Sequence, residues 1–227
     1  MSNNLFNKKL IIFDFDGTLV DFIINYVSLR SEVIEYLKSA FEFPIDFFSI
    51  QDRVLTTLNK AHTFILKKES SYNLKSISND VDKIMRKWEW EAARKNKIDS
   101  NVKETLKILK NKGFKLAIFT LEPKEIIEFY LKKAKIEYLI DIIASRDIVK
   151  ELKPNPEHIN YILEKLKVKA NQAIIIGDHV IDMECGKNIG ALCIGKKSKL
   201  HTKEELLASG ADFIISKISE LNSLMKL

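Results

Sequence analysis

Apolar residues fill positions 10–13 and 15, and two aspartates and a glycine follow within the same short segment. A nearly continuous apolar run of this length predicts a buried strand of a parallel sheet over residues 10–15, and Gly17 predicts the turn at its end. Because side chains two residues apart on a strand share a face, Asp14 and Asp16 are expected to project together from the strand tip. Two carboxylates at such a short distance repel each other unless a cation or a proton lies between them. The pair therefore predicts a hard metal ion, acid–base chemistry, or both.

Residues 22–97 carry a different pattern, with apolar positions spaced three and four apart. Between Gly17 and Gly113 the chain has no glycine and a single proline, Pro44. This spacing predicts amphipathic helices, so we expect an all-helical insertion. Over residues 21–100 thirteen basic residues nearly balance twelve acidic ones, which argues against a nucleic-acid-binding arm.

From residue 101 onward short apolar runs alternate with helical stripes, which predicts a right-handed parallel sheet with helices on both faces. The expected fold class is α/β, with a Rossmann-like sheet in a catalytic core formed by residues 1–20 and 101–227 and an inserted helical cap over 21–100. The expected strands of the second part are 114–120, 140–144, 173–176, 191–194 and 213–215, and its expected helices are 101–112, 124–133, 157–166 and 182–189.

The composition of the chain narrows the class of protein. A hydrophobic content of 46% and a charged content of 30% are typical of a soluble globular protein. The net charge of +6 comes from lysines spread along the chain, which indicates a solvated surface, so no nucleic-acid partner is expected. Cys185 and Cys193 lack metal-ligand spacing and predict reduced core residues. The polar start and the lack of an apolar stretch of ~20 residues predict a cytoplasmic protein without a membrane span. The oligomeric state is not readable from the sequence.

Polar residues gather in four clusters at or just after predicted strand ends. They are Asp14–Thr18, Thr120, Lys153–Pro156 between a predicted strand and a predicted helix, and the Gly-Asp-His-Val-Ile-Asp segment 177–182. Each cluster alone is typical of a turn or a helix cap. Together, in this order around an inserted helical segment, they indicate one functional site.

This set resembles the four motifs of the haloacid dehalogenase-like superfamily of hydrolases, which run Asp-x-Asp-Gly-Thr, Ser or Thr, Lys, and Gly-Asp-x-x-x-Asp. The resemblance extends from Asp14 to Asp182 in the family's order. A helical insertion between the first two motifs is similar to the cap of the subfamily that contains phosphoglycolate phosphatase. The resemblance implies a Mg²⁺-dependent phosphatase that hydrolyses a small phosphate monoester, such as phosphoglycolate, a nucleotide or a sugar phosphate, through an aspartyl-phosphate.

The resemblance implies a role for each acidic residue. Asp14 would be the nucleophile that attacks phosphorus, a reaction for which a carboxylate is competent. Asp16 would protonate the leaving oxygen and then take a proton from the attacking water. Mg²⁺ prefers oxygen ligands and would be held by Asp14, the backbone carbonyl of Asp16, and Asp178. Asp182 would orient Lys153 or a metal-bound water.

The remaining motif residues would bind the phosphate. Lys153 would neutralise phosphate charge and keep Asp14 ionised. Thr120 and the backbone N–H groups after Asp14 would donate hydrogen bonds to phosphate oxygens. Gly17 would let the backbone approach the phosphate closely.

Two positions depart from the family pattern. Leu121 stands where many relatives have an asparagine, so no side-chain contact to phosphate is expected there. His179 stands where a small hydroxyl residue is frequent. It is either a partner of the site residues or a solvent-facing turn residue, and we favour the turn.

Several alternatives stay open within the superfamily. Asp16 argues against dehalogenation, because the dehalogenases lack this second aspartate. Sugar phosphomutases often carry a histidine just after the first motif. Residues 21–26 contain no histidine, which disfavours a phosphomutase but leaves it open. A pyrophosphatase of the same superfamily also stays open. A phosphonate-cleaving enzyme would need a Schiff-base lysine in the cap. Lys38 and Lys60 are the candidates, although solvated surface lysines are the stronger expectation for both. A non-catalytic binding protein is the alternative from another class, although fold alone does not establish function and the motif residues are all kept.

Substrate-contacting residues are expected in the helical insertion, because a cap that closes over a site excludes water and favours small esters. Arg30, Arg53 and His62 are candidates as polar groups on apolar helices, although surface exposure explains them equally well. A nucleic-acid end phosphatase is a further alternative, which would need a basic groove lined by aromatic residues such as Trp88 and Trp90. Trp88 is instead expected to pack between the cap and the core.

Overall fold

A computed structural model describes residues 7–21, 24–68 and 73–226 of the chain. The chain divides into two compact units, one formed by Met1–Phe22 with Asn96–Leu227 and the other by Ile23–Lys95. The first is here called the α/β unit and the second the helical unit.

The α/β unit contains a six-stranded sheet with the strand order β3-β2-β1-β4-β5-β6, and all of its strand pairs are parallel. Buried apolar runs form its central strands, as expected for a sheet that is covered on both faces. The strands are β1 (Leu10–Phe13), β2 (Lys115–Phe119), β3 (Ile142–Ala144), β4 (Ala173–Gly177), β5 (Leu192–Lys196) and β6 (Phe213–Ile215).

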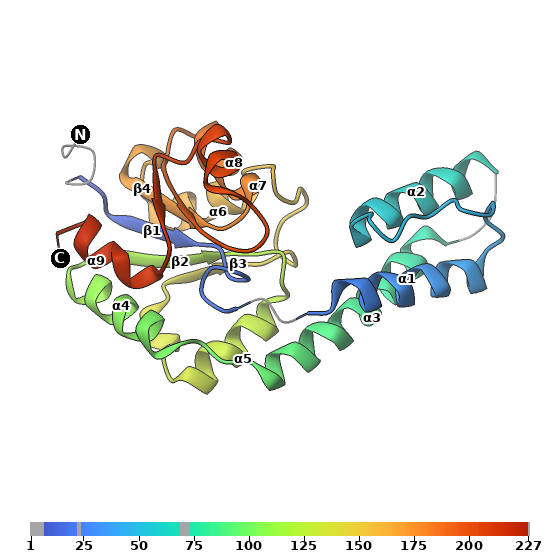
Figure 1. The fold of residues 1–227 in the computed structure, drawn as a ribbon, viewed down its shortest axis with the longest axis horizontal. Coiled ribbons are helices and arrows are strands. Elements are labelled where there is room, and N and C mark those ends of the chain that lie inside the picture. The colour runs from blue at the N-terminus through green and yellow to red at the C-terminus, as the bar shows by residue number, and fades with distance from the viewer. Residues whose placement is uncertain (1–6, 22–23, 69–72, 227) are drawn as a thin grey trace. The chain divides into compact units, whose positions relative to one another are not determined.

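Helices cover both faces of this sheet (Figure 1). Leu10 and Ile12 point to one face, where they pack with α6 (Glu157–Leu166), α7 (Val180–Asn188) and α8 (Lys203–Ala208). Helices α4 (Ser100–Asn111), α5 (Lys124–Ala134) and α9 (Leu221–Leu224) lie on the other face. Short 3₁₀ turns form at Glu137–Leu139, Ala170–Gln172 and Ile218–Glu220. The predicted α/β fold class is confirmed.

Details of several predicted elements were wrong. Strand β1 ends at Phe13, because the carbonyl of Phe15 accepts hydrogen bonds from the N–H groups of Thr18, Leu19 and Val20 and so closes a tight loop. Asp14 and Asp16 therefore lie beyond the strand, and the same-face argument does not apply to them. Helix α7 begins at Val180 and not at residue 182, and the short helices α8 and α9 were not predicted.

The helical unit consists of α1 (Tyr26–Ala40), α2 (Val54–Lys67) and α3 (Leu74–Lys95), in agreement with the predicted all-helical insertion. Residues 22–23 and 69–72 of the predicted insertion lie outside the described residues. Its core joins buried aliphatic side chains of the three helices, and Trp88 packs against this core while its Nε1 donates to Glu32 at 2.7 Å. Among the described residues, no helix has the length and apolar character needed to cross a membrane.

Candidate active site

The strand order places the candidate site at the centre of the sheet. Chain connections run from β1 to β2 on one side and from β4 to β5 on the other, so the order reverses between β1 and β4. Open α/β sheets bind ligands outside the carboxyl ends of the strands at such a point. Asp14 follows β1, with its N–H donating to Ile176 O at 2.7 Å, and Asp178 follows β4.

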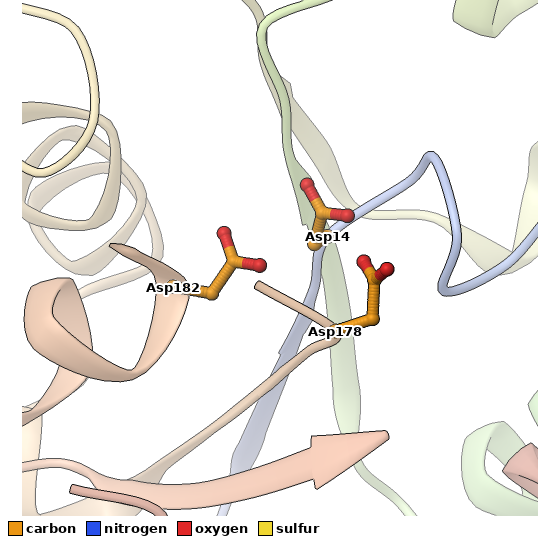
Figure 2. Close-up of side chains that lie close together, drawn as sticks. All are labelled: Asp14, Asp178 and Asp182. Atoms are coloured by element: carbon orange, nitrogen blue, oxygen red, sulfur yellow. The ribbon is translucent and has the colours of Figure 1, made fainter. Parts of the chain in front are cut away.

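Three carboxylates converge at this point (Figure 2). One oxygen from each of Asp14, Asp178 and Asp182 lies within 4.8 Å of the others. The residues are only 8%, 1% and 1% exposed, respectively. Such carboxylates repel one another strongly, so the cluster needs positive charge, protons, or both.

Lys153 supplies one positive charge. Its Nζ donates to Asp14 Oδ1 at 2.6 Å and to Asp182 Oδ1 at 2.8 Å, and it lies 3.6 Å from the ring centroid of Phe119. A buried ion pair of this kind is tolerated only when hydrogen bonds satisfy its members, as they do here. The lysine therefore links the first motif to the last.

Burial and neighbouring charges shift the pKa values of Asp14, Asp178 and Lys153. Burial raises the pKa of Asp14 well above its ordinary value, and Lys153 opposes that rise. Burial and the Asp182 carboxylate also raise the pKa of Asp178. Burial alone would lower the pKa of Lys153, but the carboxylates of Asp14 and Asp182 outweigh it and raise that pKa, so the ammonium stays charged.

Asp182 uses both of its oxygens inside the protein. Oδ1 accepts from Lys153, and Oδ2 accepts from the N–H of His179 at 3.1 Å at the start of α7. The ring Nδ1 of His179 accepts from Ile181 N at 3.2 Å, so His179 caps the helix. His179 lies in a bend, as predicted, but its ring is half-buried and packs edge-on against His201, and its N–H contacts Asp182 of the site.

The remaining oxygens suit a hard cation. Asp178 Oδ2 is buried and has no hydrogen-bond partner among the described residues. Gly17, with φ +79°, lies directly beside the same carboxylate, and any side chain at Gly17 would overlap Asp178 Oδ2. Carboxylate oxygens are the donors that Mg²⁺ and similar ions prefer. Asp14 and Asp178 could therefore hold a divalent cation, whereas Asp182 is already engaged.

Thr120 lies at the carboxyl end of β2 and is 1% exposed. Its Oγ1 accepts from the N–H of Glu122 at 3.0 Å, which leaves the hydroxyl hydrogen available for donation. The N–H of Gly17 donates to Val20 O at 2.8 Å within the loop, so Gly17 contributes space and backbone conformation at this site.

Asp16 is not a member of the three-carboxylate cluster. It is half-buried in the loop after β1 and forms an isolated bridge with Val20. Burial raises the pKa of Tyr130, and the negative charges of Asp16 and Glu122 raise it further. The role of Asp16 in proton transfer stays a prediction.

The candidates for substrate contact make local interactions in the helical unit. Arg30 donates to Ile50 O at 3.3 Å and lies over the ring of Tyr26. His62 Nε2 lies 3.3 Å from the hydroxyl of Ser78, and Arg53 precedes α2 as its cap residue.

Two polar contacts at the site were not predicted. Thr18 Oγ1 donates to Asp178 Oδ1 at 3.3 Å, and Lys196 Nζ donates to Gly17 O at 2.7 Å. The threonine belongs to the first motif, so its closeness to the site was foreseeable. Lys196 belongs to no motif and lies two residues beyond the strand predicted over 191–194, whereas the observed β5 extends to it.

Comparisons with known proteins agree with this geometry. The model of the family described as haloacid dehalogenase-like hydrolase matches residues 11–196. The phosphoglycolate phosphatase of Vibrio parahaemolyticus is 27% identical over 223 residues, 94% of each chain. The pyrophosphatase PpaX of Bacillus mycoides is 31% identical over 120 residues, which are 53% of this chain and 56% of that protein. A solved hydrolase from Pseudomonas syringae shares the fold, with a TM-score of 0.69 at 19% identity over 97% of this chain and 99% of its own.

Proposed function

The chain belongs to the haloacid dehalogenase-like hydrolase family, and we propose that it is a phosphatase that hydrolyses small phosphate monoesters with Asp14 as the nucleophile. One observation carries the proposal: the buried Asp14 is held by Lys153 at 2.6 Å and lies beside Asp178 at the carboxyl edge of the sheet. A structural ion pair would not need three convergent carboxylates. An anionic nucleophile that must meet an anionic phosphate does need this compensation of charge.

The proposed reaction has two steps. In the first, a carboxylate oxygen of Asp14 attacks phosphorus while the bond to the ester oxygen breaks, and the carboxyl of Asp16 gives its proton to the leaving alcohol. In the second, water attacks the phosphorus of the aspartyl-phosphate, the bond between the Asp14 oxygen and phosphorus breaks, and Asp16 takes a proton from the water. Orthophosphate leaves, and both carboxyl groups return to their starting states.

Other residues would stabilise the charge that develops on the phosphoryl oxygens. Lys153 keeps a fixed ammonium beside Asp14, and the hydroxyl of Thr120 is available as a donor. Mg²⁺ held by Asp14, the carbonyl of Asp16 and Asp178 would supply Lewis-acid charge neutralisation at the phosphate. The buried oxygen of Asp178 without a protein partner supports that ligand set.

We also propose that the two units divide the work, with the α/β unit as catalytic core and the helical unit as a cap that selects the substrate. The support for this division is that the convergent carboxylates all belong to the α/β unit. Arg30, Arg53 and His62 remain the proposed selectivity residues of the cap.

The test is the release of phosphate from an aryl phosphate in the presence of Mg²⁺. Asp14→Asn should abolish turnover, and a chelator should do the same to the wild type. Asp141→Asn is a matched control, because Asp141 lies just before β3, at the opposite end of the sheet from Asp14. Its carboxylate accepts from Leu116 N and pairs with Lys110. Turnover by Asp14→Asn comparable to that of the control would refute the mechanism.

A pyrophosphatase is the second candidate, favoured by the match to PpaX over 120 residues. A screen of phosphoglycolate, nucleotides, sugar phosphates and pyrophosphate separates the two candidates by kcat/KM. If Mg²⁺ binds but no compound in the screen is turned over, a non-catalytic binding protein becomes the better explanation.

A further inference from the structure

Lys196 is a lysine at the site to which the motifs assign no role. It is the last residue of β5, and Gly195 before it pairs with Gly177 of β4. This register places Lys196 beside the segment that carries Asp178. Its Nζ reaches across to the carbonyl oxygen of Gly17 at 2.7 Å, a contact between residues 179 positions apart in the chain.

The carbonyl that Lys196 binds belongs to Gly17, whose surroundings leave no room for a side chain. Gly17 has φ +79°, a conformation that favours glycine, and a side chain there would overlap Asp178. Its N–H already donates to Val20 O at 2.8 Å. Because the peptide unit is planar, fixing the Gly17 carbonyl also fixes the orientation of the Thr18 N–H.

Thr18 completes this arrangement from the other side. Its hydroxyl donates to Asp178 Oδ1 at 3.3 Å, and its N–H donates to Phe15 O at 3.2 Å. The loop is thus connected to Asp178 by a neutral donor and to β5 by a charged donor. Charge-assisted hydrogen bonds are the stronger of these two kinds.

We propose that Lys196 is a positioning residue, whose ammonium fixes the Gly17 carbonyl and thereby holds the loop of Asp14–Thr18 in place against Asp178. The proposal rests on the proposed function, because it assigns Lys196 an effect on the rate of a reaction at Asp14. The ammonium also opposes the rise that burial causes in the pKa of Asp178.

This arrangement makes a specific kinetic prediction. Lys196 acts on the backbone of the loop, so its loss should misplace the nucleophile without removing a contact to the substrate. Misplacement of a reacting group by about 1 Å can cost about a hundredfold in rate. We therefore expect Lys196→Met to lower kcat by about tenfold to a hundredfold and to leave KM within about twofold, and Lys196→Arg to restore most of kcat.

The matched control is Lys197→Met, which removes the neighbouring exposed lysine and should leave kcat unchanged. A second readout does not require activity: residue-resolved hydrogen exchange of the Gly17 and Leu19 amides, both of which donate within the loop at 2.8 Å. Their exchange should accelerate in Lys196→Met and stay at the wild-type rate in Lys196→Arg and Lys197→Met. Should Lys196→Met fail to fold, Lys196→Gln, which keeps a neutral donor, should show an intermediate acceleration.

The proposal is overturned if the loop amides exchange at the wild-type rate in the variants that lack the ammonium. It is also overturned if kcat stays within twofold of the wild type, or if Lys197→Met causes the same loss. A wild type that releases no phosphate from any ester would refute the proposed function instead, and the exchange rates would still decide whether Lys196 holds the loop.

Discussion

The interior of the α/β unit holds charged side chains, whereas that of the helical unit is almost entirely apolar and aromatic. Of the twelve buried polar or charged residues among those described, only Thr57 and Glu89 belong to the helical unit. The core of the helical unit instead brings together phenylalanine rings, with Phe43 and Phe48 at 4.7 Å between centroids. Ion pairs of the helical unit, such as that of Lys83 with Asp80, lie at its surface.

This contrast separates an interior that holds ionisable groups at a candidate site from one that is held together by packing. Burial of apolar side chains stabilises a fold, whereas burial of an unpaired charge lowers its stability by several kcal/mol. The α/β unit accepts that cost for Asp14, Lys153 and Asp182 at one edge of its sheet. Buried ionisable groups with shifted pKa values cluster at functional sites, so the contrast supports placing the chemistry in this unit.

The largest expected effect comes from breaking the buried charge network. Lys153→Met leaves Asp14 and Asp182 without their shared ammonium, so the free energy of unfolding should fall by about 3 to 5 kcal/mol. Phosphatase activity should fall by about a thousandfold. The control is Lys83→Met in the helical unit, whose exposed pair with Asp80 should leave stability unchanged within error. Urea unfolding of both variants measures the difference, and equal losses would contradict the contrast between the units.

Much of the α/β fold could be predicted, because strands buried on both faces must be continuous apolar runs and helices must carry a periodic stripe. The helix over 157–166 and the strand over 213–215 were placed at their observed bounds. Helices α8 and α9 are six and four residues long, too short to show a period. The end of β1 could not be predicted either, because it depends on the hydrogen bonds of the loop around Phe15.

The candidate site, like the fold, could be predicted only in part. That Asp14, Lys153 and Asp178 lie together could be expected, since the carboxyl ends of parallel strands meet at one edge of the sheet. The contact of Lys196 with Gly17 depends on the register of β5 on β4, which no local pattern encodes. The capping role of His179 likewise depends on α7 beginning at Val180.

The second prediction tests whether packing alone holds the helical unit. Phe48 is 8% exposed and packs against Phe43 and Phe47, so Phe48→Ala should destabilise this unit by about 3 kcal/mol. Hydrogen exchange should accelerate in α1 and remain slow in β4, because each unit has its own core. Phe48→Leu should cost less, since it leaves a smaller cavity. Equal acceleration in β4 would show that the two cores are not independent.

The third prediction concerns a buried histidine of the α/β unit. Burial, with a smaller effect of the Lys153 ammonium, lowers the pKa of His158 to about 4. Between pH 4 and the ordinary value near 6.5, the unfolded chain binds a proton that the folded chain does not. Stability should therefore fall as the pH drops through this window, and His158 should account for about 2 to 3 kcal/mol of the fall.

Comparison of two variants isolates this effect. In His158→Leu the dependence of unfolding free energy on pH between 5 and 7 should flatten relative to the wild type. His62→Leu in the helical unit should flatten it less, because His62 is only half-buried, although burial lowers its pKa too. Parallel curves for His158→Leu and the wild type would show that His158 is protonated equally in both states.

The smallest expected effect compares two buried threonines, one in each unit. Thr18 donates to the Asp178 carboxylate at 3.3 Å, whereas Thr57 lies in the core of the helical unit. A long hydrogen bond to a charged group contributes about 1 kcal/mol, so Thr18→Val should weaken Mg²⁺ binding about fivefold in calorimetry. Thr57→Val should leave that affinity unchanged, whatever it does to stability. If the two variants bind Mg²⁺ alike, the Thr18 hydroxyl does not help Asp178 to hold a cation, and the carboxylate cluster alone sets the affinity.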